Sequence, residues 1–273
     1  MNGNEERRIS MGDTSPSIHR AAADGYALSA DLYARGRPEY PEEILAWLCD
    51  SLALRSGRVA IDLGAGSGKF TGYLLRTGAS VIAVEPVPQM LEKLALAWPD
   101  VARHRGTAEA IPLPDGSADA VVCAQAFHWF ANAAALTEIH RVLKPGGRLG
   151  LIWNVRDASV GWVKQLNAIF DRREGDTPRY ASGGWARAFP FAGFGPMRAA
   201  HFRHGHTGTA DDVIINRVRS TSFIAALPAD EEAKVVAQVR SLIDATPELK
   251  GRDVVTMPYV TDAYSMTKAT SAD

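Results

Sequence analysis

The chain has 273 residues, of which 46% are apolar and 22% are charged, and its formal net charge is −1. This length allows one large core, and the composition is that of an ordinary globular protein rather than a disordered or fibrous one. Because the charge lacks the concentrated positive field used to bind phosphate backbones, we expect a small-molecule partner and no nucleic acid.

Targeting signals and disulfides are not indicated. Residues 1–10 are polar and charged without an apolar centre, and no apolar run approaches the ~20 residues that span a bilayer. The only cysteines, Cys49 and Cys123, lie inside apolar stretches, which favours two buried thiols over a disulfide. We therefore expect a cytoplasmic protein that does not associate with membranes and is either a monomer or a homodimer.

The N-terminal part divides into a tail and a helical segment. Residues 1–17 are polar and contain Gly, Asn and Pro, so we expect a flexible tail. Residues 18–273 are predicted to form one domain, of which 18–57 is an N-terminal cap segment. In this segment, Pro41 and the acidic pair that follows it favour the first turn of a helix, with Ile44, Leu45, Leu48 and Leu52 on one face.

Residues 58–155 alternate short apolar runs with helix-length segments. This pattern is typical of parallel strands joined by right-handed crossover helices. The predicted strands are 59–63, 81–84, 101–104, 120–124 and 148–153, and the predicted helices are 70–76, 88–97 and 132–143. The glycine and proline run at 144–147 is expected to end the last helix.

After residue 155 the pattern changes, and 156–273 is predicted to supply lid helices and the final strands. Apolar residues recur at helical spacing from Trp162 to Ile169, strands are expected at 197–204 and 254–264, and a helix is expected from about Ala229. Thr209 and Asp212 form a capping-box pattern at another helix start. The predicted fold is α/β: a Rossmann-like, doubly wound, seven-stranded and mostly parallel sheet with the last strand antiparallel, plus a helical lid over the site.

The strongest single pattern is a strand that runs into a glycine turn, from Val59 to Gly68. Glycine is needed there because a Cβ would keep a ligand from the turn backbone, and a following helix N-terminus offers unpaired N–H groups to a carboxylate. Glu85 ends the next strand about twenty residues after Gly64, where a carboxylate can accept both hydroxyls of a ribose. Together the two features predict a nucleotide-like ligand.

The glycine spacing separates two kinds of ligand. The dinucleotide pattern G-x-G-x-x-G would require glycine at position 69, which is Lys69, whereas the third glycine is Gly68. This disfavours a nicotinamide-dependent dehydrogenase. The observed G-x-G-x-G, with Asp62 on the strand, resembles motif I of the class I methyltransferases, which use S-adenosylmethionine.

The resemblance continues in order over about one hundred residues. Val81 to Pro86 resembles the family's second motif and Gly106 to Pro112 its adenine-contacting segment, while 119–130 and 141–147 match further segments. Tyr33-x-x-x-Arg37-Pro38-x-Tyr40-Pro41 resembles a segment found in a subset of small-molecule methyltransferases, including relatives of the trans-aconitate methyltransferases. The chain is thus similar to the group of type 11 and trans-aconitate methyltransferase-like proteins. The resemblance implies S-adenosylmethionine as cofactor.

The resemblance also implies which residues bind this cofactor. Glu85 is expected at the ribose, Gly64 and Gly66 at the methionine end, and Gln125 is expected to line the site with its backbone. The family commonly has Asp where this chain has Thr107, so here the threonine hydroxyl is the candidate adenine contact. The expected cofactor-binding residues are Tyr33, Arg37, Asp62, Gly64, Ala65, Gly66, Glu85, Pro86, Met90, Thr107, Ala108, Glu109 and Gln125.

Two interpretations of the role of Arg37 stay open. Its planar fork of donors can clamp a carboxylate, either of the cofactor or of the substrate. Alternatively, Arg37 packs against the two tyrosines of its segment and is paired at the surface.

Methyl transfer from a sulfonium mainly requires alignment in a dry cavity, and an acceptor that carries a proton also requires a base. His128 follows the fourth strand at the edge where ligands of doubly wound sheets bind, so it is the candidate catalytic base, with the alternative that it only orders its loop. Trp129 and Phe130 are candidate substrate contacts that form an aromatic wall. His201 and Arg203 are further candidates for contact with an anionic substrate.

No metal site is predicted, because His201, His204 and His206 lack a cysteine or carboxylate at a recognisable spacing. The predicted function is transfer of a methyl group to an O or N atom of a small molecule, with a carboxylate or a heterocycle of secondary metabolism as the acceptor types considered. The alternative is a catalytically silent module that senses S-adenosylmethionine by binding it.

Overall fold

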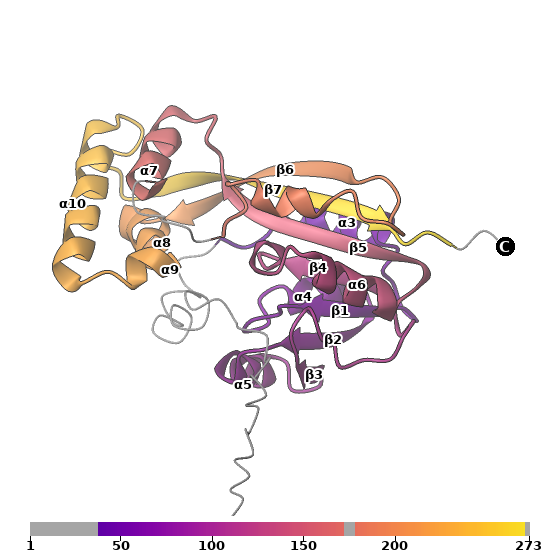
Figure 1. Ribbon diagram of the computed structural model, residues 1–273. Coiled ribbons are helices and arrows are strands. Elements are labelled where there is room, and N and C mark those ends of the chain that lie inside the picture. The colour runs from indigo at the N-terminus through magenta and orange to yellow at the C-terminus, as the bar shows by residue number, and fades with distance from the viewer. Residues whose placement is uncertain (1–37, 172–177, 271–273) are drawn as a thin grey trace, which may run out of the picture.

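A computed structural model describes residues 38–171 and 178–270 of the chain (Figure 1). Its centre is a seven-stranded sheet with the strand order β3-β2-β1-β4-β5-β7-β6. The strands are β1 Val59–Leu63, β2 Ser80–Glu85, β3 Ala102–Arg105, β4 Ala118–Ala124, β5 Leu143–Arg156, β6 Arg198–Gly208 and β7 Val255–Thr267.

The strand directions confirm the predicted fold class. The pairs β1–β2, β1–β4, β2–β3 and β4–β5 are parallel, while β7 is antiparallel to both β5 and β6. The strand order reverses between β1 and β4, so the carboxyl ends of these two neighbours open a crevice at the switch point. The site must therefore be sought at the ends of β1, β2 and β4.

The boundary before β5 differs from the expectation. The run at 144–147 was expected to end a helix before a strand at 148–153, but the helix α6 Ala133–Val142 ends earlier and β5 begins directly after it, at Leu143. Leu143 pairs with Ala118, and the register shifts between Ala118 and Ala120. Gly146 has φ +71°. The early pairing is possible because this shift in register, a bulge-like irregularity, accommodates the residues at 144–147 within the strand. The pattern of apolar residues along the sequence does not reveal such an irregularity.

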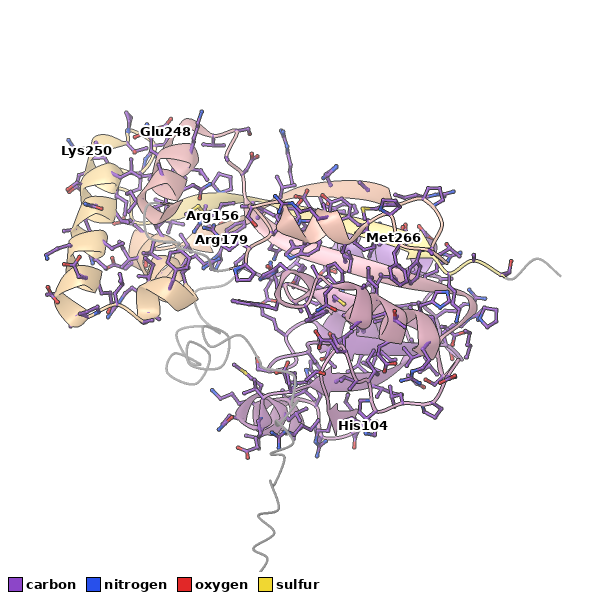
Figure 2. The ribbon with its side chains drawn as sticks, viewed as in Figure 1. His104, Arg156, Arg179, Glu248, Lys250 and Met266 are labelled. Carbon is purple, nitrogen blue, oxygen red and sulfur yellow. The ribbon has the colours of Figure 1, made fainter. Side chains whose placement is uncertain are left out.

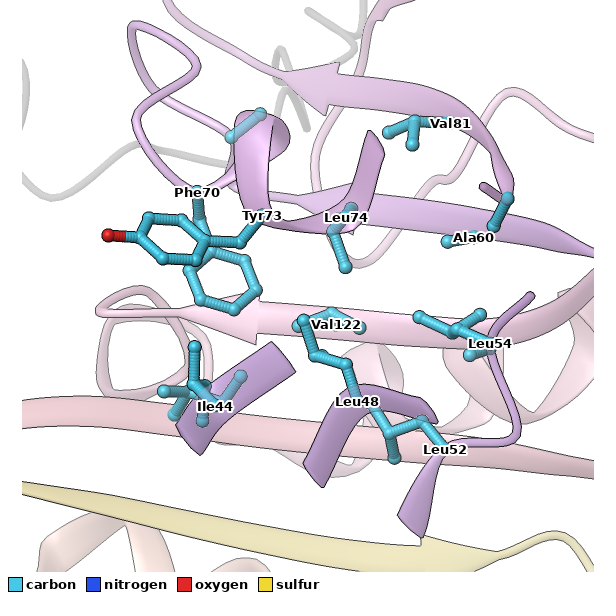
Figure 3. Packing of buried hydrophobic residues seen from close by; sticks show 14 of the residues in the cluster. Ile44, Leu48, Leu52, Leu54, Ala60, Phe70, Tyr73, Leu74, Val81 and Val122 are labelled. Atoms are coloured by element: carbon cyan, nitrogen blue, oxygen red, sulfur yellow. The ribbon is translucent and has the colours of Figure 1, made fainter. Parts of the chain in front are cut away.

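Helices cover both faces of the sheet. The helices are α3 Glu43–Ser51, α4 Thr71–Arg76, α5 Pro88–Ala97, α6, α7 Gly161–Asp171, α8 Asn216–Arg219, α9 Ser222–Ala225 and α10 Ala229–Ala245, with short helical turns η1 Phe127–Trp129, η2 Gly184–Ala188 and η3 Asp211–Ile215. Alternate residues of a strand serve opposite faces: in β4, Val122 packs with α3 and α4 (Figure 3), whereas Val121 and Cys123 pack with α6. Ile44 and Leu48 of α3 are fully buried in the first cluster, as the helical pattern predicted.

The helices α7 to α10 gather beyond one end of the long strands β5 and β7, at the left of Figure 1. They share a third apolar cluster, in which Trp162 of α7, Val213 of η3, Val235 of α10 and Tyr259 of β7 are buried. The capping pattern before η3 is confirmed, since Thr209 Oγ1 accepts a hydrogen bond from Asp212 N–H at 3.1 Å. None of the helices in the described ranges is long and apolar enough to cross a membrane.

Candidate functional site

The glycine turn after β1 forms the floor of a cavity of about 200 Å³. Gly66 has φ +57°, and a Cβ built on it would meet nothing within 4 Å, so this glycine serves the left-handed backbone and leaves space open above the turn. Gly64 has φ +71°, and its Cβ would lie 2.7 Å from that of Ala126. Gly64 therefore also allows the loop after β4 to approach the turn closely.

The sequence suggested that N–H groups at the glycine turn are unpaired and can bind a ligand carboxylate, but in the structure several of them already bond to the protein. The helix α4 begins only at Thr71. Before it, the N–H groups of Gly64 and Ala65 donate to Val84 O at 2.8 and 3.3 Å, and that of Gly66 donates to the Glu85 carboxylate at 2.9 Å. The turn is thus tied to the end of β2, and its bonds shape the cavity floor.

Glu85 is the last residue of β2, beside the glycine turn, and is 7% exposed. Its Oε2 accepts from Gly66 N–H and its Oε1 accepts from Val87 N–H at 3.0 Å. Burial raises the pKa of Glu85, and these two backbone hydrogen bonds oppose the rise. Each carboxylate oxygen has a second lone pair, so the group fits a pair of ribose hydroxyls.

Asp62 lies deeper in the same cavity and is 1% exposed. The Thr71 hydroxyl donates to its Oδ2 at 2.7 Å. Burial raises the Asp62 pKa to about 7, against the effect of that hydrogen bond. A cation that enters the cavity would favour the ionised form, so this side chain suits an ammonium or sulfonium group.

The segment expected to contact adenine lines the opposite wall. Within the described ranges, Thr107 Oγ1 is buried and has no hydrogen-bond partner. A buried hydroxyl without a partner is costly, so a ligand atom at this position would stabilise the wall. This observation fits the adenine ring of the cofactor.

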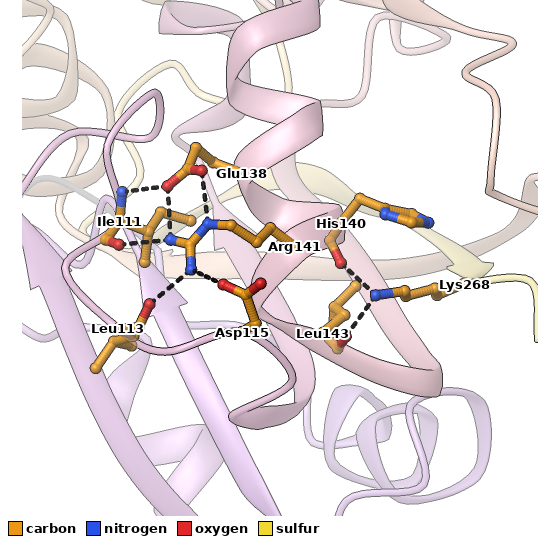
Figure 4. Close-up of polar contacts among 8 residues, drawn as sticks. All are labelled: Ile111, Leu113, Asp115, Glu138, His140, Arg141, Leu143 and Lys268. Atoms are coloured by element: carbon orange, nitrogen blue, oxygen red, sulfur yellow. Dashed lines mark hydrogen bonds and ion pairs between the residues drawn. The ribbon is translucent and has the colours of Figure 1, made fainter.

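Arg141 of α6 holds the chain that follows this segment (Figure 4). Its guanidinium donates to the backbone oxygens of Ile111 and Leu113 at 2.9 Å each, and it pairs with Asp115 and Glu138 at 2.7 Å. Glu138 also accepts from Ile111 N–H at 3.0 Å. The network fixes the adenine wall to the helix behind it.

Gln125 follows β4 directly and has φ +58°, which is uncommon for a residue other than glycine. Its backbone N–H donates to Ile152 O at 2.8 Å and its side-chain amide donates to Asn154 O at 3.1 Å. These bonds to β5 hold the strained backbone at the cavity rim. A strained residue at the switch point is typical of functional sites.

The cavity brings together all the described residues that were expected to bind cofactor or form the aromatic wall. Its lining includes Asp62, Gly64, Ala65, Gly66, Glu85, Pro86, Met90, Thr107, Ala108, Glu109, Gln125, Trp129 and Phe130. Tyr33 and Arg37, and the expected tail 1–17, lie outside the described residues.

Other lining residues were missed by sequence reasoning. Asn154 follows the strand predicted at 148–153, so the rule that picked His128 could also have found it. Tyr259 and Arg217 come from β7 and α8, in the last third of the chain and far downstream of the glycine turn. No local pattern marks them, because only the tertiary fold brings them to the cavity.

His128 lines a second cavity, of about 150 Å³, and not the first. Its Nδ1 accepts a hydrogen bond from the indole Nε1 of Trp153 at 3.1 Å. Because an indole N–H can only donate, a neutral His128 in this arrangement carries its hydrogen on Nε2. To act as a base, His128 would have to give up the hydrogen bond from Trp153, so that a ring nitrogen has a free lone pair for the proton. The role of His128 as base therefore stays a prediction.

His201 and Arg203 do not line either cavity. Both side chains are exposed, by 59% and 80%, on the sheet-edge strand β6. His201 Nδ1 lies 2.6 Å from Asp262 Oδ1, and Arg203 lies 4.0 Å from Asp157. Both side chains point to partners outside the two cavities, so their contact with an anionic substrate stays a prediction.

The sheet order, with its antiparallel seventh strand and a glycine turn at the switch point, defines a Rossmann-like fold with a nucleotide-type site. Residues 61–151 match the model of a family described as a methyltransferase domain. An uncharacterized methyltransferase-like protein of Schizosaccharomyces pombe is 40% identical over 237 residues, which cover 86% of this chain and 92% of that protein. An uncharacterized methyltransferase of Mycobacterium tuberculosis is also 40% identical, over 87% of this chain and 93% of its own.

Solved structures agree. A structure described as a type II methyltransferase from Anaeromyxobacter dehalogenans is 25% identical with a TM-score of 0.63, over 86% of this chain and 97% of that one. Phosphoethanolamine N-methyltransferase 2 of Haemonchus contortus, solved with S-adenosylhomocysteine, shares the fold at 14% identity and a TM-score of 0.54, over 93% of this chain and 61% of that one. The chain belongs to the class I methyltransferases, and its cofactor is S-adenosylmethionine.

Proposed function

We propose that this methyltransferase transfers its methyl group to an O or N atom of a small-molecule acceptor. The observation that carries the proposal is the joint between the two cavities. Gln125, Trp129, Asn154 and Arg217 line both of them. A cofactor in the first cavity and an acceptor in the second would therefore meet at these four residues.

In this proposal the first cavity holds S-adenosylmethionine along its length. Glu85 accepts the ribose hydroxyls, while Asp62 and the turn at Gly64, Ala65 and Gly66 face the charged methionine end. The adenine lies between Pro86 and Met90 on one side and the wall at Thr107, Ala108 and Glu109 on the other. Asn132 supports this wall, because its side-chain amide donates to Glu109 at 2.9 Å.

When bound, the cofactor supplies an electrophilic methyl carbon on a sulfonium that becomes neutral as the methyl group leaves. The protein aligns the acceptor with this carbon at the joint, where Trp129 excludes water, and Phe130 excludes water from the first cavity. Where the acceptor atom carries a proton, His128 is the proposed base from the second cavity. An acceptor that is already deprotonated needs no base.

We place the enzyme in the cytoplasm, because Cys49 and Cys123 are both free thiols, as expected in a reducing compartment. An acceptor from secondary metabolism, and a monomeric or homodimeric state, stay predictions.

The test is incubation with methyl-labelled S-adenosylmethionine and a metabolite extract. A labelled small molecule that forms only with the wild-type protein, and not with a Glu85→Ala variant, would support the proposal. A protein that binds cofactor but labels nothing across extracts would favour the silent sensor instead.

A further inference from the structure

The side chain of Tyr259 in β7 ends in a buried hydroxyl that bonds to none of the described residues. Tyr259 is 1% exposed, and within the described ranges its hydroxyl has no hydrogen-bond partner. A buried hydroxyl without a partner costs free energy, and most buried polar groups of native proteins are bonded. Because Tyr259 lines the first cavity, a bound molecule can supply the missing partner.

Tyr259 lies beside the joint of the two cavities. In the pair β5–β7 it is in register with Arg156, which Figure 2 shows where the sheet meets the helices α7 to α10. Thr261 is two residues further along β7, so it lies on the same face of the sheet. The Thr261 hydroxyl donates a hydrogen bond to Asn154 Oδ1. Since Asn154 lines both cavities, the side chains on this face of β7 border the joint.

The strand order separates Tyr259 from the part of the first cavity that we assign to the adenosyl group. Glu85 ends β2 and the glycine turn follows β1, whereas β7 lies three strands beyond β1 in the order β1-β4-β5-β7. Neighbouring strands are about 4.8 Å apart, so the backbones of β1 and β7 are roughly 14 Å apart. A tyrosine side chain is much shorter than this distance. The hydroxyl is therefore placed for the acceptor rather than for the cofactor.

Packing holds the Tyr259 ring in a fixed position. His204 of β6 is in register with Tyr259 and stacks on its ring, with the ring centroids 5.7 Å apart. His204 is itself held, because its Nε2 lies 3.0 Å from the Thr261 hydroxyl oxygen. Tyr259 also belongs to the buried apolar cluster that contains Trp162 and Val213. A hydroxyl on a ring held in this way is preorganised for a ligand.

We propose that the Tyr259 hydroxyl binds the methyl acceptor, through a hydrogen bond to an O or N atom close to the atom that is methylated. A phenol both donates and accepts, so it fits a carbonyl, a hydroxyl or a ring nitrogen. An acceptor without a polar atom at this place would leave the hydroxyl unbonded, so Tyr259 also selects among acceptors. This inference rests on the proposed function, since it assumes that a small-molecule acceptor reaches the joint.

The experiment compares the full-length wild type with Tyr259→Phe, which removes the hydroxyl oxygen and keeps the ring. Tyr264→Phe is the matched control. Tyr264 lies on the same strand and lines neither cavity, but its hydroxyl oxygen lies 2.7 Å from that of Tyr180. Three quantities are measured: the melting temperature without ligand, the Kd of S-adenosylhomocysteine by calorimetry, and the rate of transfer from methyl-labelled S-adenosylmethionine in a dilution series of a metabolite extract.

The melting temperature of Tyr259→Phe should be unchanged or higher, because the lost hydroxyl has no partner to give up. Tyr264→Phe loses a bonded hydroxyl and should unfold about 2–4 °C below the wild type. Both variants should keep the wild-type Kd for S-adenosylhomocysteine. In dilute extract, transfer by Tyr259→Phe should be about tenfold slower or worse, and concentrated extract should restore part of the rate, as expected for weaker acceptor binding. Tyr264→Phe should transfer like the wild type.

The inference is overturned if Tyr259→Phe transfers methyl groups like the wild type at every dilution. It is also overturned if the melting temperature of Tyr259→Phe falls as that of Tyr264→Phe does, because its hydroxyl would then have a partner in the protein. A raised Kd for S-adenosylhomocysteine in Tyr259→Phe would assign the hydroxyl to the cofactor instead. If the wild type binds S-adenosylhomocysteine but labels nothing in any extract, the proposed function fails and this inference fails with it.

Discussion

Removal of the Glu85 carboxylate should weaken cofactor binding more than any other single loss of charge in the first cavity. The group is 7% exposed and already accepts two backbone N–H bonds, at 2.9 and 3.0 Å, which fix its position before a ligand arrives. Hydrogen bonds to a charged group contribute ~1.5–3 kcal/mol each. The buried carboxylate also gives up hydration, which offsets part of this gain.

For Glu85→Ala we therefore expect a loss of ~1–3 kcal/mol of binding free energy for S-adenosylhomocysteine, or an increase of about 5- to 150-fold in Kd. The assay is isothermal titration calorimetry near neutral pH, with unfolding by urea in parallel, because the variant also leaves Gly66 N–H without its carboxylate partner. Glu85→Gln keeps the size of the side chain and one oxygen acceptor, so it should show a smaller increase in Kd and a smaller loss of stability.

A pH series separates charge from shape. Because burial raises the pKa of Glu85, wild-type affinity should fall as the pH is lowered and the carboxylate becomes protonated, whereas Glu85→Gln should show a weaker dependence, which comes from Asp62 in the same cavity. The control is Glu92→Ala on the exposed side of α5, a glutamate that lines neither cavity. Unchanged Kd in a folded Glu85→Ala variant would refute the ribose role.

Four further predictions address other parts of the site and the fold. The unfolding free energy of the wild type, relative to Asp62→Asn, should fall as pH rises from about 4 to about 7, because burial raises the pKa of this acid from its ordinary 3.8 to about 7; equal pH slopes in urea unfolding would contradict this. His128→Ala should lower kcat by ~10²–10⁴ with S-adenosylhomocysteine affinity retained if it is the base, and normal turnover on an identified acceptor would remove that role. Arg141→Ala should lower the urea-unfolding free energy by ~2–4 kcal/mol through loss of its network, and a change below ~0.5 kcal/mol would show that the network is dispensable. Gly64→Ala should destabilise the protein by ~1–3 kcal/mol, since φ is +71° and the new Cβ would meet Ala126 at 2.7 Å; an unchanged melting temperature would contradict this.

Much of the fold could be predicted because its strands and helices have strong local patterns. The strand β1 and the helices α5 and α10 begin at the residues expected, since each follows a clear apolar period and a turn or proline signal. The start of β5 was missed because it pairs with β4 through an irregular register, and this irregularity leaves no regular pattern of apolar residues in the sequence. The shared apolar cluster of α7 to α10 was not foreseen either, since pairing between helices depends on tertiary packing that one sequence does not reveal.

The candidate cofactor site was predictable to the extent that its residues follow strand ends. Glu85 and Gln125 lie directly after or at the ends of β2 and β4, where doubly wound sheets bind ligands. Arg217 had no such pattern around it, because arginines are frequent on any surface and only the fold shows that this one lines the cavity. The spacing of His201 and Arg203 on a strand is compatible with a site, but both lie on the exposed face of β6 and line neither cavity, so their role stays a prediction.

The most direct test of the central claim is a crystal structure of the full chain with S-adenosylhomocysteine. We predict that the ligand fills the first cavity, with both ribose hydroxyls within hydrogen-bond distance of Glu85, the amino-acid end at Asp62 and Gly66, and the sulfur directed to the joint at Gln125 and Trp129. A ligand bound elsewhere, or bound in this cavity with its ribose away from Glu85, would contradict the account.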